Sequence, residues 1–241
     1  MTKFIALVSG KGGVGKTTAT INLGHALTKL GKNTLILDAN LSTPNLALNL
    51  GLTNPKKTLN GFLQKREELK EIIQTHKSGI NFIPTSPSYS ELLNTNMEDI
   101  TEIFEHLENH YEFVLVDCPS GLKDDLSHVL MNTDEALIVV NPNLSSVMDA
   151  LKTTHLAEAH NNTIAGVLLN KTNKGKHELK PQEVEEILGH KIIGNIRTDK
   201  KIRKALHLSS PLNHLYPRSK SAKTFQKIAE HLSLNDELNI R

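Results

Sequence analysis

A glycine-rich run near the N-terminus contains the pattern G-x-x-x-x-G-K-[ST], whose residue types bind phosphate groups. Its glycines let successive backbone N–H groups point inward at phosphate oxygens, and the helix expected to follow adds a favourable dipole. We expect Lys16 to neutralise the β- and γ-phosphates of a nucleotide and Thr17 to bind Mg²⁺ through its hydroxyl. The predicted nucleotide-binding residues of this run are Gly10, Lys11, Gly12, Gly13, Val14, Gly15, Lys16, Thr17 and Thr18.

An aspartate, Asp117, ends the apolar run Phe113–Val116 and precedes Cys118-Pro119-Ser120-Gly121. Ligands bind at the carboxyl edge of parallel sheets, so an aspartate there, beside the phosphate loop, can hold Mg²⁺, usually through a water. The alternative is an aspartate that only caps the next turn. We expect Pro119 and Gly121 to form a segment whose path changes with the γ-phosphate.

The run Asn170-Lys171-Thr172-Asn173 bears on which base is bound. Proteins that recognise guanine use Asn-Lys-x-Asp, whose carboxylate accepts bonds from both the ring N–H and the amino group. Asn173 places an amide there, and an amide does not accept two such bonds cleanly. Adenine offers an amino donor that the side-chain oxygen of Asn170 can accept, so the sequence favours ATP over GTP.

The elements that must position these residues are short apolar runs separated by longer amphipathic segments. The predicted strands are Phe4–Val8, Thr34–Leu37, Ile80–Ile83, Phe113–Val116, Ala136–Val140, Ile164–Leu169 and Lys191–Ile196. The predicted helices are Thr17–Lys29, Met97–His110, Ser145–Ala159, Pro181–Leu188, Lys200–Leu208 and Ser219–Leu234. Strands that are apolar at nearly every position require helices on both faces, so we predict an α/β fold with a single doubly wound, mostly parallel sheet flanked by helices. No linker or repeat divides the chain, so residues 1–241 are expected to form one domain.

The composition places the chain among globular proteins. Of its 241 residues, 38% are hydrophobic and 22% charged, which excludes a disordered or collagen-like chain. The net charge of +2 is too small to indicate nucleic acid or an acidic partner. The lone Cys118 and the absence of a secretory signal favour a cytoplasmic protein. The apolar runs fall short of the ~20 residues of a membrane helix.

Local features qualify that picture. We expect mobile loops at Asn170–Pro181 and Leu208–Ser221, where periodicity lapses. The tail Ser233–Arg241 lacks a basic amphipathic face, so membrane binding is not expected without an adaptor. Basic residues that lie along two predicted helices form either a solvated face or a surface for DNA phosphates. They are Lys200, Lys201, Arg203, Lys204, Arg218, Lys220, Lys223 and Lys227.

The phosphate loop carries a second lysine, Lys11, which gives K-G-G-x-G-K-T-T. This motif resembles the deviant Walker A motif of the MinD/ParA family of ATPases, and the run Asp38-Ala39-Asn40 with Pro44-Asn45 following resembles archaeal MinD-like members. The resemblance runs through nearly the whole chain, with its specific motifs at Lys11–Thr18, Asp38, Asp117 and Asn170, and implies a P-loop NTPase fold. In that family the early lysine reaches across a dimer to the partner subunit's nucleotide, which implies this role for Lys11.

The resemblance has one departure, in the run Leu35-Ile36-Leu37-Asp38-Ala39-Asn40. The family carries Asp-x-Asp there, and its second aspartate positions the attacking water. The resemblance places Asp38 in the Mg²⁺ shell, but Asn40 can only orient a water and cannot take up its proton, so slow hydrolysis is expected. The implied catalytic residues are Lys11, Lys16, Asp38 and Asn40. Asp199 matches a family loop over the base, or else caps the helix that begins at Lys200.

The resemblance implies a switch in which ATP and Mg²⁺ join two copies of the chain, and the homodimer then binds an unidentified protein partner or a surface. Its output would be intracellular spatial organisation, such as placing a division site or a cargo. Two alternatives stay open: a ParA-like ATPase that partitions DNA, and a nucleotide-binding scaffold with negligible hydrolysis. Iron–sulfur relatives need paired cysteines, and Cys118 is alone.

Overall fold

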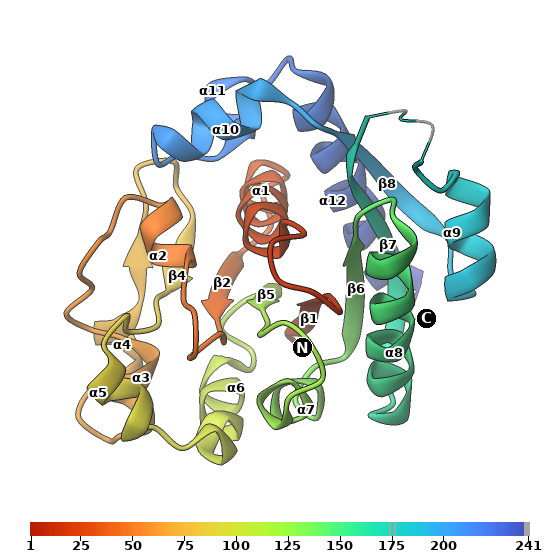
Figure 1. Ribbon diagram of the computed structural model, residues 1–241. Coiled ribbons are helices and arrows are strands. Elements are labelled where there is room, and N and C mark those ends of the chain that lie inside the picture. Colours follow the sequence, from red (N-terminus) through yellow and green to blue (C-terminus); the bar gives the residue numbers. More distant parts are fainter. Residues whose placement is uncertain (174, 176, 239–241) are drawn as a thin grey trace.

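Eight strands form one sheet in the computed structural model, which describes residues 1–173, 175 and 177–238 (Figure 1). Their order is β3-β4-β2-β5-β1-β6-β7-β8, and every neighbouring pair is parallel except β3 with β4. The strands are β1 (Lys3–Val8), β2 (Thr34–Asp38), β3 (Gln74–Thr75), β4 (Asn81–Ile83), β5 (Phe113–Asp117), β6 (Glu135–Val140), β7 (Thr163–Thr172) and β8 (Ile192–Arg197). The mostly parallel sheet predicted from the sequence is confirmed. The two-residue β3 was not predicted, because it is too short to show a pattern.

Five of the six helices predicted from the sequence are present with similar bounds, the sixth differs as described below, and further short helices were not predicted. The helices that correspond to predicted ones are α1 (Lys16–Lys29), α6 (Thr101–Leu107), α8 (Leu144–Ala159), α9 (Pro181–Leu188), α10 (Lys200–His207) and α12 (Lys220–Leu238). The additional ones are α2 (Leu46–Asn49), α3 (Leu59–Leu63), α4 (Leu69–Ile72), α5 (Tyr89–Leu93), α7 (Asp124–Leu130) and α11 (Leu212–Leu215). With four to seven residues each, these span too few turns to display a helical period.

One predicted helix, Met97–His110, is wrong in its bounds. It is a 3-10 turn over Met97–Ile100 followed by α6, which ends at Leu107. Asn109 then has a positive φ of 63°, a left-handed conformation that a helix cannot continue through.

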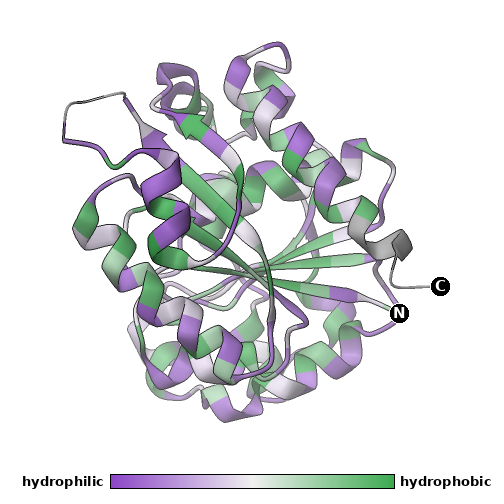
Figure 2. Ribbon diagram, turned by 90° about the vertical axis from the view of Figure 1, so that its right-hand side faces the viewer, coloured by the Kyte–Doolittle hydropathy of each residue, from purple (hydrophilic) through white to green (hydrophobic). Residues whose placement is uncertain are grey.

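Helices cover both faces of the sheet, as Figures 1 and 2 show. Alternate residues of β1 enter two different cores, because successive side chains of a strand point to opposite faces. Phe4, Ala6 and Val8 pack with α6, α7 and α8, whereas Ile5 and Leu7 pack with α1 and α12. The hydrophobic strands are therefore buried between two layers of helices. This burial is the main contribution to the stability of the sheet.

The carboxyl ends of the parallel strands bring the sequence motifs together. The central order β2-β5-β1 places Asp38 and Asp117 next to the loop that follows β1. The stretch predicted as a loop from Asn170 begins inside β7, and residues 174 and 176 of it lie outside the described part of the chain. The second predicted loop contains α11. No helix within the described residues has the length and apolar character that crossing a membrane requires.

Candidate nucleotide site

The glycine-rich loop joins the end of β1 to the first turn of the 14-residue helix α1. Gly15 caps this helix with φ 107°, and a Cβ on it would stand 2.3 Å from Nδ2 of Asn170. At Gly10 a Cβ would stand 2.2 Å from the carbonyl carbon of Asp149 in α8. Side chains are therefore excluded at both positions, and the backbone N–H groups at the start of α1 are left open for an anion.

Lys16 lies at the base of this loop and is buried, with only 8% of it exposed. Its Nζ donates to Oγ of Ser9 at 2.9 Å, which leaves other N–H donors for a phosphate. Burial lowers the pKa of Lys16, and the negative charge of Asp117 opposes that shift. The buried Lys16 ammonium has little contact with water. A bound phosphate would stabilise its positive charge in place of that water.

Three oxygen ligands meet beside Lys16 at the sheet edge. The hydroxyl of Thr17 donates to Oδ2 of Asp117 at 2.6 Å, and Asp117 pairs in register with Asp38 on the next strand. Asp38 is fully buried, and its two oxygens accept bonds from the backbone N–H groups of Asn40 at 3.1 Å and Leu46 at 3.2 Å. These bonds fix the orientation of the Asp38 carboxylate.

The paired aspartates suit a divalent cation. Burial and the neighbouring Asp117 raise the pKa of Asp38 well above its usual value. Burial also raises the pKa of Asp117 to about 6, although the Thr17 hydroxyl and the Lys16 charge act in the opposite direction. Two adjacent buried carboxylates resist ionising together unless a cation compensates them, and Mg²⁺ prefers hard oxygen ligands. The donor set therefore fits Mg²⁺, held by Thr17 directly and by the aspartates directly or through water.

Asn40 lines the nucleotide cleft, but its amide shapes its own loop. Its Oδ1 accepts from the backbone N–H of Thr43 at 3.2 Å, and its Nδ2 donates to the Thr43 carbonyl at 3.0 Å. To orient a water, Oδ1 has to share or exchange the bond to Thr43. The catalytic role of Asn40 stays a prediction.

The end of β7 approaches the phosphate loop from the other side. Nδ2 of Asn170 donates to the carbonyl of Val14 at 2.8 Å, which leaves Oδ1 as the acceptor available to a base. Nζ of Lys171 donates to the carbonyl of Gly13 at 2.6 Å. Asn170 and Lys171 both line the cleft, whereas Asn173 does not. The sequence argument quoted Lys171 only as part of the run and gave it no role.

Asp199 caps α10, which is one of the two positions expected of it. Its Oδ1 accepts from the backbone N–H of Lys201 at 2.8 Å, which confirms it as the cap of α10, and its Oδ2 accepts from Ser221 Oγ at 2.8 Å. It also lines the cleft. A contact with the base stays a prediction, because both carboxylate oxygens are already bonded within the chain.

Lys11 has a different environment from Lys16. Its ammonium forms an ion pair with Oδ2 of Asp149 at 3.2 Å and a hydrogen bond with Oγ of Ser145, both on α8. Its side chain is 43% exposed. Lys11 is not among the residues that line the cleft, so it does not cover the phosphate site of its own chain.

Between these elements lies a cleft of about 570 Å³. At the end remote from the phosphate loop its lining is partly apolar, which suits a base, through Ile202, Leu206 and Phe225. The sequence argument gave these residues no role at the nucleotide, because it considered only the basic residues of α10. The position of Ile202 and Leu206 shortly after Asp199, on the same helix, was the available signal for those two residues. The full lining is Gly12, Gly13, Gly15, Lys16, Thr17, Thr18, Asn40, Thr43, Asn45, Asn49, Ser120, Asn170, Lys171, Arg197, Thr198, Asp199, Ile202, Arg203, Leu206 and Phe225.

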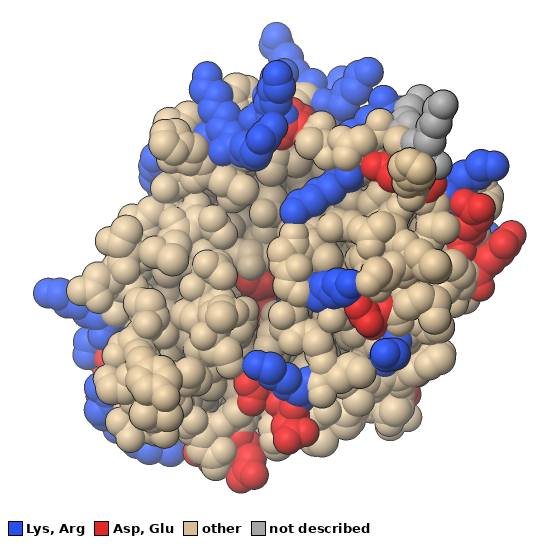
Figure 3. Space-filling model, viewed as in Figure 1, with Lys and Arg blue, Asp and Glu red and all other residues tan. Residues whose placement is uncertain are grey.

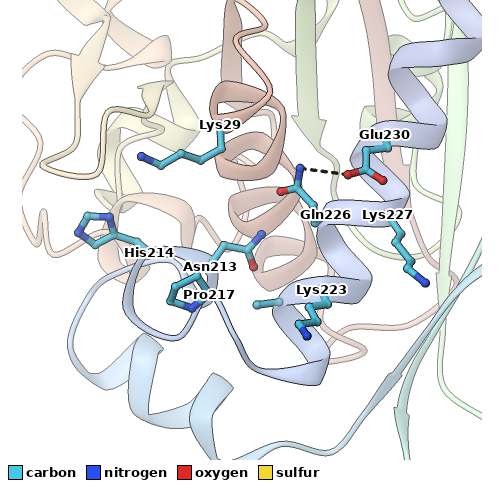
Figure 4. Close-up of a pocket in the computed structure, with 9 residues that line it drawn as sticks. Lys29, Asn213, His214, Pro217, Lys223, Gln226, Lys227 and Glu230 are labelled. Atoms are coloured by element: carbon cyan, nitrogen blue, oxygen red, sulfur yellow. Dashed lines mark hydrogen bonds between the residues drawn. The ribbon is translucent and has the colours of Figure 1, made fainter.

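A second hollow of about 570 Å³ lies between α1, α11 and α12 (Figure 4). Three lysines line it, Lys29, Lys223 and Lys227, and the side chains of Lys29 and Lys227 point away from each other. The polar contact between its lining residues is the bond from Gln226 Nε2 to Glu230 Oε1 at 3.4 Å. The lysine charges do not meet at one position, so this hollow is a poor anion site.

A phosphate loop, a Mg²⁺-type ligand set and a base-sized cleft at the edge of a parallel sheet define a P-loop nucleoside triphosphatase. The chain belongs to the ParA/MinD family. The family model ParA, described as "NUBPL iron-transfer P-loop NTPase", matches residues 1–233. An uncharacterised ATP-binding protein of Methanocaldococcus jannaschii is 34% identical over 95% of this chain and 86% of its own. A putative septum site-determining protein MinD of Emiliania huxleyi is also 34% identical, over 88% of this chain and 80% of its own.

Solved structures agree with these relatives. The cell division ATPase MinD of Pyrococcus furiosus superposes with a TM-score of 0.92 at 31% identity, covering 97% of this chain and 99% of that one. MinD of Pyrococcus horikoshii, solved with Mg-ADP, gives 0.92 at 30% identity over 96% of each chain. MinD from the MinC:MinD complex of Aquifex aeolicus gives 0.86 at 30% identity over 96% of each chain. This chain is therefore a MinD-like ATPase of the family, which uses ATP with Mg²⁺.

Proposed function

We propose that this chain is a cytoplasmic ATP- and Mg²⁺-dependent homodimerisation switch, whose dimer binds a protein partner or a surface in spatial organisation. The observation that carries the proposal is the placement of Lys11. It belongs to the phosphate loop, yet it is half exposed and turned onto α8, outside the cleft of its own chain. A lysine so placed is available to the nucleotide of a second copy, where it would supply charge as an arginine finger does.

The surface next to Lys11 supports contact with a second copy. Leu144 and Met148, on the helix that holds Lys11, are 58% and 43% exposed, and Leu122, just after Gly121, is 53% exposed. Large apolar side chains gathered around a charged site are typical of a protein interface. A second copy seated on this surface would cover these side chains.

The site supports hydrolysis with the work divided among its residues. Lys16 would neutralise the phosphates, while Thr17, Asp38 and Asp117 would hold Mg²⁺, which supplies further charge stabilisation when bound. Asn40 would orient the attacking water by one accepted hydrogen bond. Because its amide cannot take up a proton, we propose slow turnover and a long-lived ATP dimer until a partner completes the site.

Nucleic acid binding is the second candidate, and the charge distribution supports it. Figure 3 shows lysine and arginine side chains gathered at the end of the molecule where α10 and α11 lie. The exposed basic residues of α10 are Lys200, Lys201, Arg203 and Lys204. A DNA-partitioning ATPase would bind DNA only with ATP, without sequence preference and with strong salt dependence.

Two other functions have less support. A scaffold that never hydrolyses ATP would fit Asn40, and measured turnover separates it from a switch. An iron–sulfur role, suggested by the description of the matching family model, requires more thiolates than the chain offers. The sequence has one cysteine, Cys118, which is fully buried, and burial raises the pKa of its thiol.

Size-exclusion chromatography with light scattering tests the proposal on the nucleotide-free protein and on its Mg-ADP and non-hydrolysable Mg-ATP forms. We expect a dimer with the ATP analogue alone, and no shift on adding lipid vesicles. A monomer under all conditions would contradict the switch. A nucleotide-dependent shift that appears only with DNA would favour the partitioning ATPase.

A further inference from the structure

Lys171 occupies an irregular position near the end of β7. The pairing of β7 with β8 shifts between Asn170, which pairs with Ile196, and Thr172, which pairs with Arg197, so Lys171 is an extra residue in a bulge. Its φ is 58°, the left-handed region that side chains other than glycine adopt at a cost. Strained residues of this kind persist where the surrounding structure holds them, and they concentrate at functional sites.

The bulge turns Lys171 out of the sheet and onto the phosphate loop. Its exposed side chain lines the nucleotide cleft, and Nζ donates to the carbonyl of Gly13 at 2.6 Å. The preceding residue, Asn170, donates to the next carbonyl, that of Val14, at 2.8 Å. Two successive β7 side chains thus hold two successive loop carbonyls.

These two bonds set the direction of the loop's N–H groups. A trans peptide is planar, so the carbonyl of one residue points opposite to the N–H of the next. Fixing the Gly13 carbonyl therefore fixes the N–H of Val14, and fixing the Val14 carbonyl fixes the N–H of Gly15. These N–H groups precede the first turn of α1, where a bound diphosphate would lie. Without the Lys171 bond, the peptide after Gly13 (φ 74°) is freer to rotate.

The backbone of Lys171 contacts the other side of the cleft. Its carbonyl accepts bonds from Oγ1 of Thr198 at 3.3 Å and from Nδ2 of Asn173 at 3.1 Å. Thr198 precedes the cap of α10 and lines the base end of the cleft. One strained residue therefore connects the segment beside the base with the loop that holds the phosphates.

We propose that Lys171 is a positioning residue that presets the phosphate loop for the β-phosphate of nucleoside di- and triphosphates. The proposal rests on the nucleotide site proposed above. Lys171 would then contribute to recognition of the diphosphate, whereas Asn170 contributes to recognition of the base. The strain at the bulge is retained because the left-handed backbone aims the side chain at Gly13.

Calorimetric binding of Mg-ATP, Mg-ADP and AMP to Lys171→Met and Lys171→Arg tests this role. We expect Lys171→Met to weaken ATP and ADP about tenfold and to leave AMP, which lacks a β-phosphate, unchanged. Lys171→Arg keeps the charge and a donor and should recover most of the affinity. The matched control is Lys191→Met, which removes an exposed lysine ahead of β8 and away from the cleft, with no expected effect.

A second pair of variants separates positioning from folding. Lys171→Ala and Lys171→Gly both lose the bond to Gly13, but only glycine relieves the left-handed strain. We expect equal losses of ADP affinity, with the glycine variant unfolding at the higher temperature. If Lys171 were needed only for folding, the less stable variant, Lys171→Ala, would instead bind ADP more weakly than Lys171→Gly.

The outcomes are distinct. Unchanged ADP affinity in Lys171→Met would overturn the proposal. An equal loss of affinity for AMP and ADP would overturn it too, because the effect would then not depend on the β-phosphate. If wild-type protein binds no Mg-ADP, the nucleotide site itself is wrong, and this result is seen before any variant is made.

Discussion

The inner and outer halves of the nucleotide site are built differently. In the inner half, Lys16 bonds Ser9 and Thr17 bonds Asp117, and both Lys16 and Asp117 are buried. In the outer half, Lys11 and Asn40 are exposed or half exposed, and each is occupied by a contact within its own segment or with α8. Nucleotide binding can therefore be a property of the single chain. The dimerisation and hydrolysis proposed above would require the outer contacts to be exchanged.

Alanine at each of the two loop lysines gives the largest expected contrast. Lys16→Ala removes the buried cation at the phosphates and should abolish nucleotide binding. Lys11→Ala should bind Mg-ATP with near wild-type affinity but fail to dimerise, because its ammonium lies outside its own cleft. Calorimetry and light scattering on both variants measure this. If Lys11→Ala dimerised like wild type, the inner and outer halves would not be functionally separate.

The next largest effect is expected at Asn40. Asn40→Asp introduces a group that can take up a proton from water, and single-turnover hydrolysis should rise about ten- to a hundredfold, or roughly 1.4 to 2.7 kcal/mol of barrier. The acceptor for the Thr43 N–H is kept in this variant. ATP affinity should change little. Asn40→Ala is the control and should show no acceleration, and an aspartate variant no faster than wild type would place the water elsewhere.

A smaller effect concerns the base. With Asn170 Nδ2 held by Val14, its Oδ1 can accept the adenine amino group, whereas guanine presents a carbonyl there. We expect ATP to bind at least about tenfold more tightly than GTP, about 1.4 kcal/mol. Competition binding with Mg²⁺ measures the ratio. Equal affinities would show that the segment at the end of β7 does not read the base.

The smallest effect is on stability and concerns the paired carboxylates. The pKa of Asp117 is raised to about 6 in the folded protein, from near 4 in the unfolded chain, so the folded state holds this proton more tightly. The stabilisation that results is fully present below pH 4 and is lost as the pH rises through 6. Asp117→Asn removes this loss and should stabilise the nucleotide-free protein by about 1 kcal/mol at pH 7.5, with no gain near pH 4. Urea unfolding at both pH values measures it.

The control for this prediction is Glu105→Gln, which neutralises an exposed carboxylate on α6. A gain from Asp117→Asn that is equal at both pH values would show that the pair is not the cause. The same variant should lose Mg²⁺-dependent nucleotide affinity, because an amide is a weaker ligand for a hard cation.

The parts of the site that the sequence predicted are local in the chain. Contiguous apolar runs gave most strands, and one ten-residue motif predicted the loop that binds phosphate. Contacts between distant residues were not predictable. The ion pair of Lys11 with Asp149 joins residues 138 positions apart, and the Lys171 bulge depends on how β8 pairs with β7. Asp199 shows the limit, since its cap to α10 followed from the sequence but its bond to Ser221 did not.

The close approach at Gly10 has a mechanical consequence. The loop and the first turns of α8 meet backbone against backbone, with no side chain between them whose rotamers would absorb a displacement. A shift of the loop on phosphate binding would therefore displace α8 as well, a single helix of 16 residues from Leu144 to Ala159. Because α8 also packs against α9, β6 and β7, we expect part of that displacement to reach the surface that these elements form.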